Sequence, residues 1–165
     1  CSGCLYAIYK KYFFIIYQAK SKRFMTLTKK NSRAFFENIY DGNNLVACIL
    51  KSNYISSGID FLTEPTVDMQ LGYMRHKSGH IIKPHVHNKY KREIYTTSEA
   101  LFLKSGSVRV QIYTDKMQHL KELIMGKGDF LLLLGGGHSF EMLEDSELIE
   151  VKQGPYAGDK DKMRY

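Results

Sequence analysis

Two histidines separated by one residue are the feature of this sequence best suited to chemistry. His85 and His87 flank Val86 at the end of the segment 80–87. If this segment is a strand, its alternate residues Ile81, Lys83, His85 and His87 share one face. In a β-strand, both imidazoles would point to the same face, about two residue rises apart, which is close enough to bind one metal ion. The pattern therefore predicts a metal site on this segment.

A third histidine and a carboxylate extend the candidate site. His138 follows three glycines, which allow the backbone to turn sharply and bring the side chain back toward the interior. Glu99 begins the apolar segment 99–103 and shares a face with Leu101 and Leu103. Because buried charges are nearly always paired or bound to metal, an inward Glu99 beside three histidines has a ready explanation.

The elements that must position these side chains are predicted to be short strands. Gly, Asn and Asp punctuate the chain, and no stretch shows a sustained helical period with caps. Many short strands at even spacing predict an all-β sandwich or closed barrel. The expected strands are 36–40, 45–50, 59–62, 71–75, 80–87, 99–103, 108–113, 119–125, 130–134, 139–143 and 148–151.

The net charge of +7 does not indicate nucleic-acid binding. Residues 1–24 hold five positive charges and no acid, which leaves +2 for residues 25–165, with no basic stripe interleaved with aromatics. The apolar run 5–17 is interrupted by two lysines and is shorter than a membrane span, so no membrane partner is expected. We predict a non-domain N-terminal extension, 1–24, and one domain, 25–165. A surface-lying amphipathic helix remains the alternative for the extension.

The cysteines do not form an even disulfide framework. Cys1, Cys4 and Cys48 are three in number, and the first two make a lone CxxC without a second pair. A half zinc site or a redox pair is the functional alternative. The simpler interpretation is a reduced, cytoplasmic protein.

The order of these residues resembles that of the cupin superfamily. Gly79, His85, His87, Glu99 and Gly106 are similar to its first motif. Gly128-Asp129, an apolar strand, Gly136 and His138 are similar to its second. With the ending 151–156, the chain looks like the small single-domain cupins encoded among bacterial surface-polysaccharide genes.

The resemblance implies a fold, a ligand set and a cofactor. The fold is the cupin-type double-stranded β-helix, a jelly-roll barrel. In metal-binding cupins the matching positions are ligands, which here are His85, His87, Glu99 and His138. Such a set suits a divalent first-row metal ion, Fe, Mn, Ni or Zn, among which the sequence does not choose.

The sequence departs from the family pattern between the second histidine and the glutamate. Eleven residues separate His87 from Glu99, more than is usual, and Glu93 lies within that interval. We favour Glu99 because it leads an apolar strand and is followed by Gly106 at the expected distance. Glu93 lies among Lys and Arg residues, where a solvated ion pair is the simpler explanation.

Three further side chains are candidates for substrate binding. Lys83 shares the face of His85 and would favour an anionic ligand, and Tyr73 and Arg75 share a face that would line the cavity. The other histidines, His76, His80 and His119, and the charged stretch 160–162 are expected at the solvated surface.

Three functions remain open from the sequence. The first is a metal-dependent enzyme acting on a small, polar, sugar-derived substrate. The second is a non-catalytic sugar- or metabolite-binding cupin, and the third is a metal-free sugar-nucleotide isomerase with a histidine base. Each implies a small-molecule ligand and leaves a homodimer open.

Overall fold

The computed structural model describes residues 35–164, without the side chains of Asp159 and Lys160. The proposed extension 1–24 and the run 5–17 therefore lie outside the described residues. The strands are β1 Phe36–Asp41, β2 Asn44–Leu50, β3 Gly58–Phe61, β4 Gly72–Arg75, β5 Glu99–Ser105, β6 Ser107–Tyr113, β7 His119–Gly126, β8 Phe130–Leu133, β9 Gly137–Met142 and β10 Glu147–Lys152; a 3₁₀ helix, η1, covers Gly158–Asp161.

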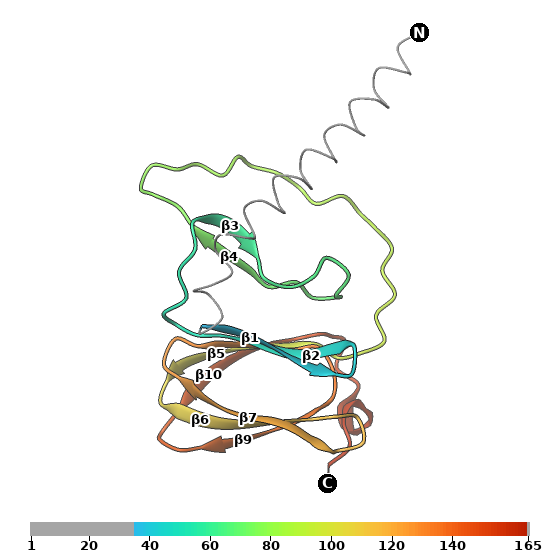
Figure 1. Cartoon of the computed structure of the whole chain (residues 1–165). Helices are drawn as coiled ribbons and strands as arrows, with labels where there is room; N and C mark the ends of the chain where they lie inside the picture. Colours follow the sequence, from blue (N-terminus) through green and yellow to red (C-terminus); the bar gives the residue numbers. More distant parts are fainter. Residues whose placement is uncertain (1–34, 165) are drawn as a thin grey trace. The chain divides into compact units, whose positions relative to one another are not determined.

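The strands form three antiparallel sheets. A five-stranded sheet has the order β1-β2-β8-β5-β10, a three-stranded sheet the order β7-β6-β9, and β3 pairs with β4 alone. The five- and three-stranded sheets lie face to face, as in a β-sandwich (Figure 1). No described strand of one sheet pairs with a strand of the other. The expected all-β class is confirmed, but the expected closed barrel is wrong: within residues 35–164, β9 and β10 lie at the edges of their sheets and do not pair with each other.

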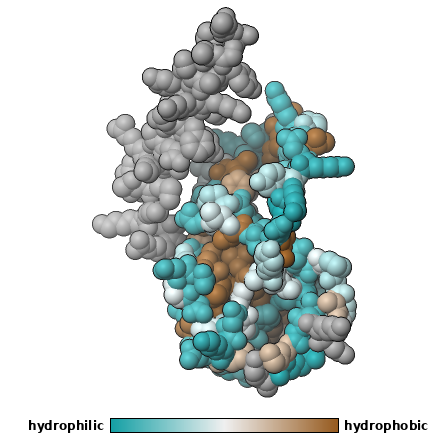
Figure 2. Space-filling view, turned by 90° about the vertical axis from the view of Figure 1, so that its right-hand side faces the viewer, coloured by the Kyte–Doolittle hydropathy of each residue, from teal (hydrophilic) through white to brown (hydrophobic). Residues whose placement is uncertain are grey.

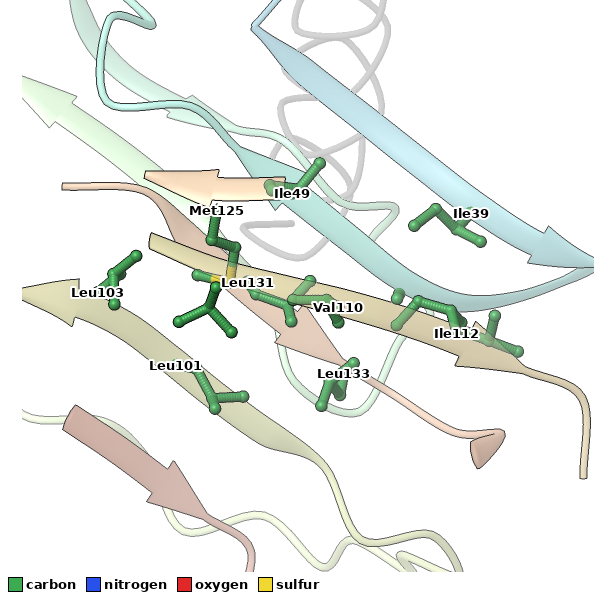
Figure 3. Packing of buried hydrophobic residues seen from close by; sticks show 12 residues of the cluster. Ile39, Ile49, Leu101, Leu103, Val110, Ile112, Met125, Leu131 and Leu133 are labelled. Carbon is green, nitrogen blue, oxygen red and sulfur yellow. The ribbon is translucent and has the colours of Figure 1, made fainter. Parts of the chain in front are cut away.

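The core fills the space between the two larger sheets. Alternate residues of β6, Val108, Val110 and Ile112, are fully buried. They meet aliphatic side chains from the facing sheet, such as Leu103 and Leu131, as Figure 3 shows for this cluster. In β6 the period-2 alternation of the sequence thus gives one apolar face, and burial of that face stabilises the sandwich.

The five-stranded sheet is also partly covered on its second face. Cys48 and Leu132 point away from the first core and pack with Leu71 and, half-buried, Leu62 and Val67, from the region between β3 and β4. This explains why β8 is apolar at consecutive positions, since a strand buried on both faces has no polar side. Figure 2 shows apolar residues reaching the surface in a patch bordered by hydrophilic ones.

The segment 76–98 contains no strand. The expected strand 80–87 is wrong: the backbone from His76 to Ser98 is irregular, and residues 76–97 are exposed. The alternation in this segment was real, but an alternating pattern forms a strand only where a neighbouring strand pairs with it. No helix among residues 35–164 is long and apolar enough to cross a membrane.

Candidate functional site

Two edge strands frame one side of the space between the sheets. On β9, His138 and Phe140 lie opposite the buried Ile112 and Val110 of β6, so they face inward. On β10, Glu150 and Lys152 lie opposite Leu101 and Glu99 of β5 and face inward too. Glu150 is nevertheless exposed, as is Met142 at 51%. This side of the sandwich is therefore open to solvent and lined by polar groups.

Glu99 and His138 meet at this opening from different sheets. Glu99 Oε2 lies 3.2 Å from His138 Nε2, with side-chain exposures of 11% and 30%. Glu99 is the first residue of β5, and its face continues into Leu101 and Leu103 as expected. His138 reaches the opening because the chain turns at Gly136, whose φ is +68°. A Cβ at Gly136 would lie 2.3 Å from the Tyr113 carbonyl oxygen, so only glycine permits this turn.

A lysine and an aspartate complete the polar cluster. Lys152 Nζ lies 3.4 Å from Glu99 Oε1 and also pairs with Asp161 on η1. The Asp161 side chain is 9% exposed. The expectation that 160–162 is simply a solvated charged stretch is therefore wrong for Asp161, which anchors Lys152 beside Glu99.

These contacts set the charge state of the cluster. The hydrogen bond from His138 lowers the pKa of the Glu99 carboxyl, against burial, which raises it; Lys152 lowers it further. The hydrogen bond to Asp161 raises the pKa of Lys152, and Glu99 contributes in the same direction. Glu99 is thus an ionised carboxylate near neutral pH. It can accept hydrogen bonds from a cationic side chain or bind a metal cation.

His85 and His87 form a second pair on the irregular segment. Their ring centroids are 5.3 Å apart at an interplanar angle of 78°. The Nδ1 atom of His85 lies 2.9 Å from the Lys83 carbonyl oxygen. When Nδ1 carries the proton and donates it there, Nε2 keeps its lone pair, which is the tautomer that a metal ligand needs.

The four predicted ligands are brought together in two pairs. No group of three or more His, Cys, Asp or Glu residues able to hold a metal ion occurs within the described part of the chain. Glu99 with His138, and His85 with His87, are the two pairs that the structure gives.

Glu93 has a different environment from Glu99. It is exposed, lies 2.7 Å from the Lys91 ammonium, and accepts a hydrogen bond from the Tyr95 hydroxyl. These contacts lower the pKa of Glu93, with that to Lys91 first. This is the solvated ion pair that the sequence predicted, and Glu99 is the glutamate that touches an imidazole.

The three candidate substrate residues lie elsewhere. Tyr73 is on β4, and its ring packs edge-on against the buried Tyr54 at a centroid distance of 5.1 Å. Arg75 ends β4 and is exposed, and Lys83 is exposed on the irregular segment. β3 and β4 lie on the side of the five-stranded sheet away from the three-stranded sheet (Figure 1). A substrate role for these residues stays a prediction.

The remaining histidines behave as surface residues. His76 and His80 are exposed and stack on each other with centroids 3.9 Å apart, and His119 is exposed beside Tyr113. This agrees with the prediction for all three.

The sequence-based prediction missed Lys152 as a member of the cluster. Its signal was available: Lys152 alternates with Leu148 and Glu150 on one face of the last strand, and Leu148 packs against the core. A charged residue on a core-facing side requires a partner, and the partner is Glu99.

Comparison with known proteins does not place the chain in a family. No family model, no curated protein and no solved structure matches it. The site's own geometry therefore carries the functional argument.

Proposed function

We propose that this chain is a metal-binding protein with the cupin-type jelly-roll fold, whose ligands are His85, His87, Glu99 and His138, acting on a small, polar, sugar-derived ligand. The observation that carries the proposal is the contact between Glu99 and His138. These two residues are far apart in sequence, lie in the first two residues of strands from opposite sheets, and were both predicted as ligands.

The donors present suit a divalent first-row metal ion. Imidazole nitrogen and carboxylate oxygen are the ligands such ions accept, and the His138 side chain, 30% exposed, can be reached from solvent. Lys152 and Asp161 would hold the Glu99 carboxylate in place, as residues behind metal ligands commonly do. The Lys83 carbonyl would fix the His85 tautomer in the same way.

Binding by all four residues requires the segment 76–98 to close over the opening. Eleven residues join His87 to Glu99, and such a chain reaches up to about 40 Å when extended. An exposed, irregular segment of this length is uncommon in a small domain unless it has a function. A metal ion would supply the free energy that orders it, and it would polarise an oxygen-bearing ligand when bound.

Elemental analysis of the purified full chain tests the proposal. We expect near-stoichiometric divalent metal in the native protein and a small fraction of it in His87→Ala, Glu99→Gln and His138→Ala, since each removes a ligand. His119→Ala, an exposed histidine outside the site, is the matched control and should keep its metal. If the three ligand variants retain as much metal as this control, the proposed site is wrong.

The same contact favours one second candidate, metal-free acid–base chemistry. A carboxylate 3.2 Å from an imidazole holds the ring in one orientation, as a sugar-nucleotide isomerase with a histidine base would need. Ligand binding measured in the presence of a chelator distinguishes the two candidates. Saturable binding of nucleotide sugars that survives chelation and is lost in His138→Ala would favour the metal-free candidate.

A further inference from the structure

The last strand of the five-stranded sheet has one side of its backbone unpaired. Among the strands of residues 35–164, β10 pairs only with β5. The Gln153 amide donates to the Ser98 carbonyl, so alternate residues 149, 151 and 153 direct their backbone groups toward β5. The backbone groups of Leu148, Glu150 and Lys152 therefore point outward, where a further strand can pair with them.

The outer face of this edge strand carries exposed apolar side chains. Ile149 and Val151 are 53% and 61% exposed on the outer face, beside Phe102 at 38%. Natural proteins usually protect an edge with lysine, proline or a bulge. β10 has a register shift only at its start, between Glu147 and Leu148, and a lysine only at its end, so the middle of its outer face carries Ile149 and Val151. A partner strand that also carries apolar side chains on its outer face would pack against Ile149 and Val151.

We propose that β10 pairs antiparallel with β10 of a second copy of this chain, in the register that places Val151 opposite the partner's Val151. Across a twofold axis perpendicular to the sheet, opposed residues share a face, and only a few registers keep the outward backbone groups paired. The Val151-centred register forms two Glu150–Lys152 pairs between copies and buries the two valines against each other.

Charge decides between this register and its neighbours. Centring on Glu150 would oppose two like carboxylates, which destabilises a strand pair. Centring on Ile149 would oppose Leu148 to the partner's Glu150 and form no ion pair. Lys152 donates to Glu99 and Asp161, and an ammonium has three donors, so one donor is left for the partner's Glu150.

Disulfide trapping of the full chain tests the register. In a Cys1→Ser, Cys4→Ser background, Val151→Cys should form a covalent dimer on mild oxidation, because directly opposed residues that do not share backbone bonds lie within disulfide range. Ile149→Cys is the matched control: its copies would lie more than about 10 Å apart along the strands, so little dimer should form. Equal or stronger trapping through position 149 would overturn the proposed register.

Sedimentation of the native chain tests the interface without engineered cysteines. We expect a concentration-dependent dimer, and in Glu150→Lys a dissociation constant raised by about tenfold or more, because two attractive pairs become repulsive. Glu144→Lys makes the same charge change at an exposed turn and should leave dimerisation unchanged. A chain that stays monomeric at high concentration, or equal effects of the two variants, would refute the interface. Sedimentation follows the mass of the protein and not its metal, so a failure of this proposal is distinguishable from a failure of the proposed metal site.

Discussion

Cys48 illustrates how burial alone lowers the reactivity of a thiol. It is fully buried on β2, in the layer between the five-stranded sheet and the β3–β4 region. Burial raises the pKa of the Cys48 thiol from 9.0 to about 12. A neutral, enclosed thiol is a poor nucleophile, so Cys48 acts here as a small apolar residue.

The raised pKa predicts a loss of stability in alkali. Above about pH 9 the unfolded chain releases the Cys48 proton while the folded chain keeps it up to about pH 12, so the free energy of unfolding falls as the pH rises. We expect the difference between the native chain and Cys48→Ala to shrink by about 1 kcal/mol between pH 8 and pH 10. Denaturant titration at the two pH values measures it; a constant difference would contradict the prediction.

The same residue should resist thiol reagents. In the Cys1→Ser, Cys4→Ser background, Cys48 should remain unmodified at neutral pH until the protein unfolds, as followed by mass spectrometry.

At the scale of elements, the turn before β9 decides where His138 lies. Gly136 has φ +68° and no space for a Cβ beside the Tyr113 carbonyl, whereas Gly135 has nothing within 4 Å of the same position. Gly136→Ala should therefore destabilise the fold by about 2 kcal/mol or more and reduce metal binding, since β9 must shift. Gly135→Ala is the control and should be nearly neutral. Thermal or denaturant unfolding of the two variants gives the comparison.

The irregular segment offers a direct test of closure. Lys89, Lys91 and Arg92 are exposed in it, so trypsin should cleave the metal-free protein at these sites before it cleaves within the strands. Added divalent metal should slow that cleavage severalfold by drawing His85 and His87 toward Glu99. The protection should be absent in His138→Ala. Cleavage at the same rate with and without metal would show that the segment does not close.

The sequence predicted most strands because the apolar pattern of each one matches the faces that are buried in the structure. The hairpin β1–β2 and the strands β5 to β10 lie close to the expected positions. Strands such as β6 alternate toward the core, and β2 and β8 are short apolar runs that are buried on both faces. The segment 80–87 alternated as well, yet pairing with another strand cannot be read from alternation. The Lys152–Asp161 contact depends on how the chain folds back after β10, which local pattern does not specify.

At the scale of the whole molecule, the described residues form two apolar clusters of their own. Both apolar clusters are built from residues between Phe36 and Leu148. A chain beginning at Met25 should therefore melt within a few degrees of the full chain. Calorimetry of the two proteins measures this, and aggregation of the shorter one would show that the apolar run 5–17 is needed.

The strand order has a consequence for how the chain folds as it is made. β2 pairs with β8, and the Leu134 amide donates to the Val46 carbonyl, so hydrogen bonds join residues almost ninety positions apart. During synthesis the β1–β2 hairpin emerges early. The edge of β2 that pairs with β8 in the folded protein stays unpaired until β8 has left the ribosome. Contacts this distant in sequence slow folding and expose strand edges meanwhile. The long segment 76–98 adds to the sequence separation between β2 and β8. Shortening it should therefore increase the rate of refolding after dilution from denaturant.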